Sequence, residues 1–311
     1  MIRVSQQTGV LLLLGAACAS EGTVTGQTTT LSRIEHVTFD SPEGWALKYF
    51  TSATTLSGLQ PPSPQVESAR LGSVTLGLES DWLPALDAAR ERVGFNGHKQ
   101  EELNKAPVIV RPIVRVGLPW KFVGVVAAPP PIHIFGVTPR VIAFGVERSI
   151  VARKQWTLGW RLSGQFGSVK AAFTCPASVL GFPPKSSENP SGCVGTSSDS
   201  AGVRYGGTEL QGTYRIPRLR RLTTHATLGF DYINTSFQVN APVTSGLDRT
   251  RLWTAGNLVA GTAGVSYLLT SRIGLTVDAF YSPLFVRRVA GGPRTNDGLF
   301  NVRALVSYTL R

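Results

Sequence analysis

Eight ionisable residues lie at alternating positions of predicted strands, on the polar face of each strand. They are Arg111, Arg115, Arg161, Arg215, Arg303, Glu209, Asp231 and Asp278. Alternate side chains of an extended strand point to opposite sides, so these groups share one side of a sheet. In a water-filled interior, such arginines attract anions and disfavour cations. In a filled interior, the same residues pair with carboxylates and satisfy buried charge. The sequence leaves both alternatives open.

The histidines give no support for catalysis. There are four of them, at His36, His98, His133 and His225. A catalytic nucleophile needs a base that a third group orients, and no serine, histidine and acid stand in such an arrangement. No histidine or cysteine pair has the spacing of metal ligands, and Asp199, Asp248 and Asp297 are scattered acids that we expect to be solvated. We therefore predict no enzyme activity, no metal and no cofactor.

Two cysteines lie in a segment rich in proline, serine, glycine and asparagine, which has no strand pattern. Cys175 and Cys193 are predicted to form a disulfide there. By loop entropy this bond contributes about 3 kcal/mol. It requires an oxidising compartment. The alternative, two unpaired cysteines, is less expected in an exported chain.

The N-terminus predicts export. Residues 1–19 have a basic residue, a short apolar core from Val10 to Ala17 and an Ala-Cys-Ala cleavage pattern, as in a signal peptide. An alternative makes Cys18 a lipidated residue. Residues 20–43 follow as a linker or a weak first strand. Residues 44–311 are the predicted barrel domain.

The segment 154–167 alternates most clearly. One face carries Trp156, Leu158, Trp160, Leu162 and Phe166, and the other carries Gln155, Thr157, Arg161, Ser163 and Gln165. Large aromatic residues lie near the strand ends. This pattern is typical of a strand with lipid on one side and a wet interior on the other.

Similar strands recur along the chain. Short connections at 217–221 and 270–272 contrast with long polar ones at 167–202, 238–250 and 284–298. From Trp45 the strand signals become regular, and Trp45, Leu47 and Tyr49 alternate with Ala46, Lys48 and Phe50. Counting the weak segment 31–39 gives twelve strands; omitting it with one neighbour gives ten. Residues 82–105 break the alternation, and Leu83, Leu86, Ala89 and Val93 approach helical spacing. We therefore predict one short helical insertion there.

Composition excludes a helical membrane protein. Charged residues make up 16% of the 311 residues, against about 25% in typical soluble domains. Mean hydropathy is +0.06. Beyond the N-terminus, no apolar stretch reaches the length of about 18 residues that a spanning helix needs. Low charge and regular strands favour an all-β chain.

The leader, the strands of roughly ten residues and the amphipathic final strand together resemble outer-membrane β-barrel proteins of Gram-negative bacteria. The chain ends Tyr308-Thr309-Leu310-Arg311 rather than on the aromatic residue usual in these proteins. The resemblance implies a transmembrane antiparallel up-and-down β-barrel in the outer membrane.

Two functions remain open. The first is a passive channel or transporter for small solutes, with a mildly positive lumen that would favour anionic ones. The second is a closed structural or surface-interaction barrel that acts through its long outer loops. Expected partners are outer-membrane lipid and lipopolysaccharide. The loop arginines that suggest lipopolysaccharide are Arg249, Arg251, Arg287, Arg288 and Arg294. We expect no nucleic acid, and the oligomeric state stays open.

Overall fold

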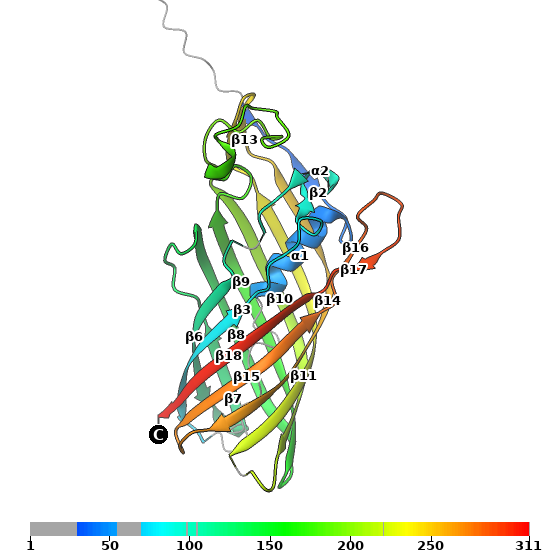
Figure 1. Cartoon of the computed structure of the whole chain (residues 1–311). Helices are drawn as coiled ribbons and strands as arrows, with labels where there is room; N and C mark the ends of the chain where they lie inside the picture. The colour runs from blue at the N-terminus through cyan, green and yellow to red at the C-terminus, as the bar shows by residue number, and fades with distance from the viewer. Residues whose placement is uncertain (1–29, 55–69, 98, 104, 220, 311) are drawn as a thin grey trace, which may run out of the picture.

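The computed structural model describes residues 30–54, 70–97, 99–103, 105–219 and 221–310. Ten strands within these ranges form one closed antiparallel barrel (Figure 1). The barrel strands are β3 (Val74–Trp82), β6 (Val108–Gly117), β7 (Phe122–Ala127), β8 (Val137–Ala152), β9 (Trp156–Ala171), β10 (Asp199–Arg215), β11 (Leu222–Gln238), β14 (Arg251–Leu268), β15 (Ile273–Ser282) and β18 (Leu299–Leu310).

The barrel closes between its first and last strands. Each strand pairs with the next one along the chain, and β3 pairs with β18 from Val74↔Leu310 to Trp82↔Val302. The predicted count of twelve strands is wrong, and the alternative count of ten is confirmed. Residues 34–36 do form a strand, β2 (Ile34–His36), but it pairs only with the start of β14, in parallel, and adds no wall strand.

The outward face of the wall is apolar. Exposed side chains on neighbouring strands include Leu78, Val114, Leu162, Leu228 and Val306. Trp156, Tyr214, Tyr267 and Tyr308 lie outward near one end of the barrel, and Trp82, Phe166 and Trp253 lie outward toward the other. An apolar band between aromatic girdles is the surface of a barrel in a bilayer. The facing predicted for 154–167 is confirmed, because Thr157, Arg161 and Gln165 are buried inside.

The two ends of the barrel differ. Four short turns join strands at one end, and one of them contains the 3-10 helix Pro119–Lys121. Long segments join strands at the other, which is the outer end by the rule that outside loops are longer. These segments carry β4 (Arg92–Val93), β5 (Lys99–Gln100), a 3-10 helix (Ala177–Val179), β12 (Ala241–Val243), β13 (Gly246–Asp248), β16 (Phe285–Val286) and β17 (Thr295–Asn296). At the same end, β1 (Thr30–Leu31), which precedes the first barrel strand, pairs in parallel with β13.

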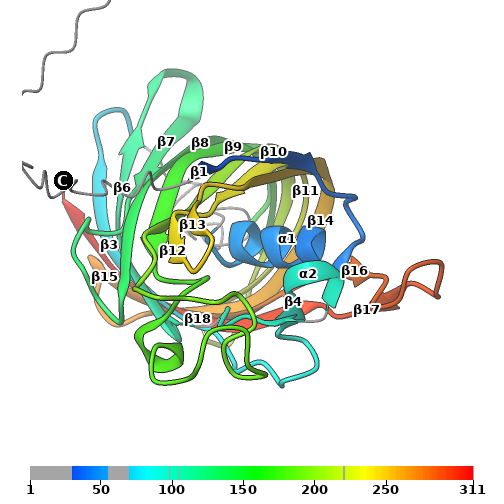
Figure 2. The same ribbon diagram turned by 90° about the horizontal axis from the view of Figure 1, so that it is seen from above.

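A helix lies inside the barrel. Figure 2 shows α1 (Pro42–Thr54) within the ring of strands. The strand predicted at 45–50 is wrong here. Trp45, Leu47 and Tyr49 alternate in sequence, yet all three are buried, together with Lys48 and Ser52. A helix that is buried all round has no polar stripe to give it a helical period. No helix among the described residues is long and apolar enough to cross a membrane.

The short helical insertion predicted at 82–105 is present, but it does not include the residues whose spacing suggested it. The only helix there among the described residues is α2 (Gly94–Gly97), flanked by the short hairpin of β4 and β5. Leu83 and Val93 nevertheless belong to the buried core, and Leu86 packs against it. Their apolar spacing therefore arises from packing against α1 and the barrel wall, since a folded loop can bury side chains without helical periodicity.

Candidate functional site

The candidate site is the lumen, where α1 meets the barrel wall. Ser41 precedes the helix and caps it, because its hydroxyl accepts a hydrogen bond from the Gly44 amide at 3.1 Å. Pro42 occupies the first helical position, where its missing N–H costs nothing. Trp45 and Tyr49 stack one turn apart, with ring centroids 5.4 Å from each other. The Ser-Pro-Glu start at residues 41–43 is a helix signal that was available in the sequence.

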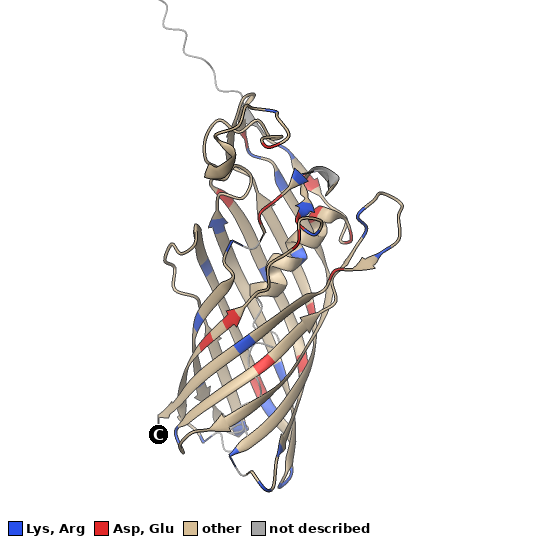
Figure 3. Ribbon diagram, in the orientation of Figure 1, with Lys and Arg blue, Asp and Glu red and all other residues tan. Residues whose placement is uncertain are grey.

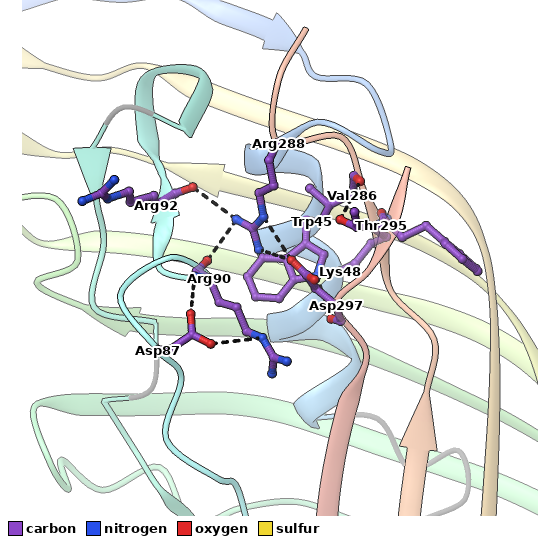
Figure 4. Close-up of polar contacts among 10 residues, drawn as sticks. Trp45, Lys48, Asp87, Arg90, Arg92, Val286, Arg288, Thr295 and Asp297 are labelled. Carbon is purple, nitrogen blue, oxygen red and sulfur yellow. Dashed lines mark hydrogen bonds and ion pairs between the residues drawn. The ribbon is translucent and has the colours of Figure 1, made fainter. Parts of the chain in front are cut away.

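Arg288 ties α1 to two outer segments (Figure 4). Its guanidinium lies 4.7 Å above the Trp45 ring and pairs with Asp297 at 2.6 Å. It also donates to the backbone carbonyls of Arg90 and Arg92 at 3.1 and 3.2 Å. The indole N–H of Trp45 donates to the Asp297 carbonyl at 3.0 Å. We call Trp45, Arg288 and Asp297 the Arg288 cluster. It joins the helix to residues 83–107 and 283–298.

A second group of contacts holds the approach to the helix. Lys48 donates to the Phe285 carbonyl at 2.6 Å and lies over the Phe39 ring. Asp40 pairs with Arg287 at 2.8 Å and with Arg294 at 3.6 Å. The hydrogen bond from Arg287 is the largest cause that lowers the pKa of Asp40 below its ordinary value. Arg287, Arg288 and Arg294, which we predicted to meet lipopolysaccharide, therefore all make ion pairs within the protein.

The inner end of α1 is anchored to the wall. Arg111 donates to the Thr54 carbonyl and to Glu79, both at 3.1 Å. Gln165 donates to the Thr54 hydroxyl at 3.0 Å. Arg111 and Gln165 come from β6 and β9, so the last residue of the helix is held by strands from different parts of the wall. The predicted inward facing of Arg111 is thus explained by the helix that it holds.

A second charged network lies across β6, β8, β9 and β10. Arg161 pairs with Glu147 at 2.9 Å and with Glu209 at 3.2 Å, and Arg115 also pairs with Glu147. When the side-chain amide of Gln211 is oriented with its oxygen toward Arg161, that oxygen accepts hydrogen bonds from Nη2 and Nε of Arg161 at 2.9 and 3.0 Å. Acidic and basic positions stand side by side on neighbouring strands in Figure 3. The sequence missed Glu147, because the facing of residues 136–150 is ambiguous there.

Arg303 is the centre of a third group. It lies 3.6 Å from Asp81 and 3.8 Å over the Phe280 ring, and it stands opposite Asp278 in the ladder. The imidazole Nε2 of His225 lies 3.9 Å from Asp278. Sequence reasoning missed Asp81 and Glu79 on β3. The alternation along β3 could have predicted their inward facing, because Glu79 and Asp81 are two residues apart and therefore lie on the same face of the strand. Both are buried.

The remaining predicted lumen residues, Arg215 and Asp231, come from β10 and β11. Arg215 is half-buried at the inner end of β10, and Asp231 is buried on β11. Short hydroxyl side chains line the same region and bond across strands. The hydroxyl groups of Thr227 and Thr262 share a hydrogen bond at 2.8 Å, and those of Ser266 and Thr276 share one at 2.9 Å. The structure therefore divides the predicted set by place: Arg111, Arg115, Arg161 and Glu209 lie in the ion pairs described above, whereas Arg215 lies at the inner end of β10.

The outer segment between β9 and β10 is ordered by the predicted disulfide. Cys175 and Cys193 are bonded, and both are buried with Val239, Ala241 and Val243. Asp199, expected to be solvated, is buried instead. Its carboxylate accepts from the amides of Phe173, Thr174 and Asn240 at 3.0, 2.7 and 2.9 Å. These bonds replace the solvation that an isolated carboxylate would need.

A polar groove lies on the outward face of β9, β10, β11 and β14, above the apolar band. Its volume is about 850 Å³. Arg204, Asn234, Gln238, Arg251 and Trp253 line it. Of the predicted outer-loop arginines, Arg251 is thus placed at a concave polar surface. Such a surface offers guanidinium, amide and aromatic contacts to an anionic or sugar-bearing ligand.

The closed barrel, apolar outside and charged inside, has the architecture of a Gram-negative outer-membrane β-barrel protein. No protein-family model matches the chain, and no curated protein matches it. Among solved structures, it is similar to the outer membrane protease OmpT from Escherichia coli, with 10% identity, 77% of this chain and 94% of that chain covered, and a TM-score of 0.38.

The chain is also similar to two further solved structures. The toluene transporter TodX of Pseudomonas putida has 11% identity and a TM-score of 0.35, with 91% of this chain and 85% of that chain covered. The translocator domain of the autotransporter NalP from Neisseria meningitidis has 11% identity and a TM-score of 0.39, with 85% of this chain and 99% of that chain covered. The likeness concerns the fold alone.

Proposed function

We propose that this protein is a closed outer-membrane barrel that acts at its outer face as a surface-interaction protein. The observation that carries the proposal is the position of α1. The helix lies in the lumen with nearly all its side chains buried, and it is fixed at both ends, by the Arg288 cluster outside and by Arg111 and Gln165 inside. An open pore would require α1 to be displaced from the lumen.

The charge arrangement supports the same proposal. An anion-selective ring needs cations that face water. Arg161 is fully buried between Glu147 and Glu209, and Arg111 is paired with Glu79. Neutralised arginines of this kind favour the structural alternative. The lumen network then serves to hold the wall and the helix together.

The outer face offers a surface for a partner. The disulfide and Asp199 fix the segment between β9 and β10, and the polar groove lies beside it with Arg204 and Arg251. We propose lipopolysaccharide as the partner, because its phosphates and sugars match guanidinium, amide and aromatic groups just above the apolar band.

Conductance tests the closed lumen. Purified protein in a planar bilayer should show no stable conductance steps. The double variant Trp45→Ala/Arg288→Ala should show them, because it removes the contacts that hold α1 at the outer end. The matched control is Trp82→Ala/Arg249→Ala, which changes the same residue types at exposed positions. Stable steps in the unmodified protein would contradict the proposal.

Lipopolysaccharide binding tests the surface role. In phospholipid nanodiscs, Arg204→Ala/Arg251→Ala should bind purified lipopolysaccharide about three- to tenfold more weakly, as expected for two exposed charge contacts. Arg218→Ala/Arg221→Ala removes two arginines at the opposite end and is the control. Equal affinities of the two double variants would reject the groove as the binding surface.

Transport remains the second candidate, and one observation favours it. The lumen near the inner end is lined by short hydroxyl side chains, such as Thr227, Thr262 and Ser266. Such a lining suits water-filled space. We propose that any passage of solute depends on displacement of α1. Disulfide-locking the helix to the wall should then abolish uptake, and uptake by the locked protein would exclude this mechanism.

A further inference from the structure

The barrel wall is interrupted between β6 and β8. The strand between them, β7, is short, and its pairing with β6 stops at Ile113↔Ala127. Its pairing with β8 stops at Ala127↔Ala143. Toward the outer end, residues 108–112 of β6 form a ladder with β3 alone, and residues 138–142 of β8 form one with β9 alone. Beyond these ladders, the Pro112 carbonyl accepts from the Ala128 amide at 3.4 Å, and Val137 forms an isolated bridge with Ile134. No described ladder joins the two edges, and the bonds across the interruption come only from residues of the segment between them.

Prolines explain where the pairing stops. Pro112 is the residue of β6 next to the last pair with β7, and it has no N–H to donate. Residues 129–131, one residue after the end of β7, are all proline, and Pro139 stands in the part of β8 that pairs with β9 but not with β7. Neither edge, nor the chain between them, offers a full set of donors. The segment 128–136 covers the interruption in place of a strand.

An apolar cavity of about 470 Å³ occupies this interruption. Val108 and Val110, which point outward and are exposed, line it. Arg111, Ala143 and Gln165, which point inward and are buried, line it as well. A cavity bounded by both faces of the wall passes through the wall. Its volume lies in the range of about 300–1,000 Å³ typical of ligand sites.

The mouth of the cavity lies at the level of lipid. Val108 pairs with Trp82, whose exposed ring marks the outer aromatic girdle, and Val110 and Val114 lie below it on the apolar face. Ile132, Ile134 and Phe135 of the covering segment are also exposed there. A molecule that reaches this mouth therefore arrives from the outer leaflet.

The inner end of the cavity is polar and incompletely bonded. Arg111 and Gln165 are both more than nine-tenths buried. Among the described residues, Nε of Arg111 and Oε1 of Gln165 have no hydrogen-bond partner. One is a donor and the other an acceptor, and unpaired buried groups of this kind cost free energy until a partner meets them. Glu79 already balances the charge of Arg111, so the partner needs no net charge.

We infer that this cavity is a lateral binding site for a single-chain amphiphile of the outer leaflet, with an uncharged oxygen-bearing head such as a hydroxyl. The head accepts from Arg111 and donates to Gln165. The aliphatic chain lies along the apolar lining toward the mouth. This site is separate from the polar groove, and it does not depend on the proposed surface role.

Photolabelling of the full protein in phospholipid nanodiscs tests the site. The probes are diazirine-tagged hexadecanol and, as a probe without the head, diazirine-tagged hexadecane. Adducts of the alcohol should concentrate on residues 108–112, 129–141 and 165–169. Ala143→Trp, which fills the cavity, should remove them. Val146→Trp, on the outward face of the same strand, should keep them. Adducts spread evenly around the apolar band would overturn the inference.

The head-group contact has its own variant. Gln165→Leu should weaken labelling by the alcohol about three- to tenfold, as expected for the loss of one buried hydrogen bond, and should leave labelling by the alkane unchanged. If Ala143→Trp does not fold, competition by an untagged ligand tests the site instead. Excess untagged hexadecanol should remove adducts in the cavity but not those on the rest of the band. Failure of this competition would overturn the inference.

Discussion

At the scale of single residues, the buried arginines hold the interior together. Arg161 is fully buried and contacts two glutamates from neighbouring strands. Removing one partner of such a group leaves buried charge without compensation, and this costs far more than the pair contributes. The residues we predicted as selectivity determinants therefore have a structural consequence that can be measured without any solute.

Substitution of Arg161 measures that consequence. Arg161→Met should lower the free energy of unfolding by about 3–5 kcal/mol, because Glu147 and Glu209 lose their shared cation. Arg215→Met, at the half-buried inner end of β10, should lower it by less than about 1 kcal/mol. Urea unfolding in detergent, followed by tryptophan fluorescence, measures both. Equal effects would show that Arg161 is solvated.

Glu101 gives the outer face a pH dependence. Its carboxylate pairs with Lys99 at 2.7 Å, yet burial outweighs this and raises its pKa to about 7 from an ordinary 4.5. Above about pH 4.5 the unfolded segment loses a proton that the folded one keeps, so stability of residues 83–107 should fall as pH rises toward about 7. Glu101→Gln should remove this dependence. Hydrogen exchange of both proteins, compared at each pH, measures it.

At the scale of elements, α1 shows how burial can hide a helix. Its Trp-x-Leu-x-Tyr run alternates like a strand, and its polar residues Lys48 and Ser52 are buried with the rest. The lumen accepts them because Lys48 finds a backbone carbonyl of residues 283–298. Gly256 of β14 helps to position the approach, since a Cβ there would lie 2.9 Å from the Phe39 ring.

The disulfide stabilises one outer element and not the barrel. Cys175 and Cys193 are 18 residues apart. Replacing both by serine should destabilise the segment between β9 and β10 by about 3 kcal/mol through loop entropy. The ladder of the ten strands does not pass through this bond. Proteolysis within residues 176–192 should therefore accelerate, while the heat-modifiable gel mobility of the barrel stays unchanged. A lost mobility shift would contradict this separation.

At the scale of the whole molecule, the barrel closes where its first strand, β3, pairs with its last strand, β18. The described N-terminal residues lie at the outer end, where β2 pairs with the start of β14. The chain then enters the lumen as α1, and β3 begins at the inner end. The wall ends with β18, which descends to the inner end beside β3.

This path predicts the accessibility of two serines. Ser32 and Ser271 are both exposed, the first at the outer end and the second in a short inner turn. In intact cells, Ser32→Cys should react with a membrane-impermeant maleimide, and Ser271→Cys should react only after the outer membrane is opened. The unmodified protein is the control. Labelling of Ser271→Cys in intact cells would reverse the orientation.

The sequence by itself determined the wall. Period-two alternation in 154–167 and 300–310 fixed which side chains meet lipid, because a strand has only two faces, and the paired cysteines followed from their shared unpatterned segment. The tertiary structure decided the rest. The strand count depended on residues 45–50, where a helix buried all round carries no periodic signal. The partners of Arg161 and Arg111 depended on strand register and on the place of α1, since both join residues far apart in the chain.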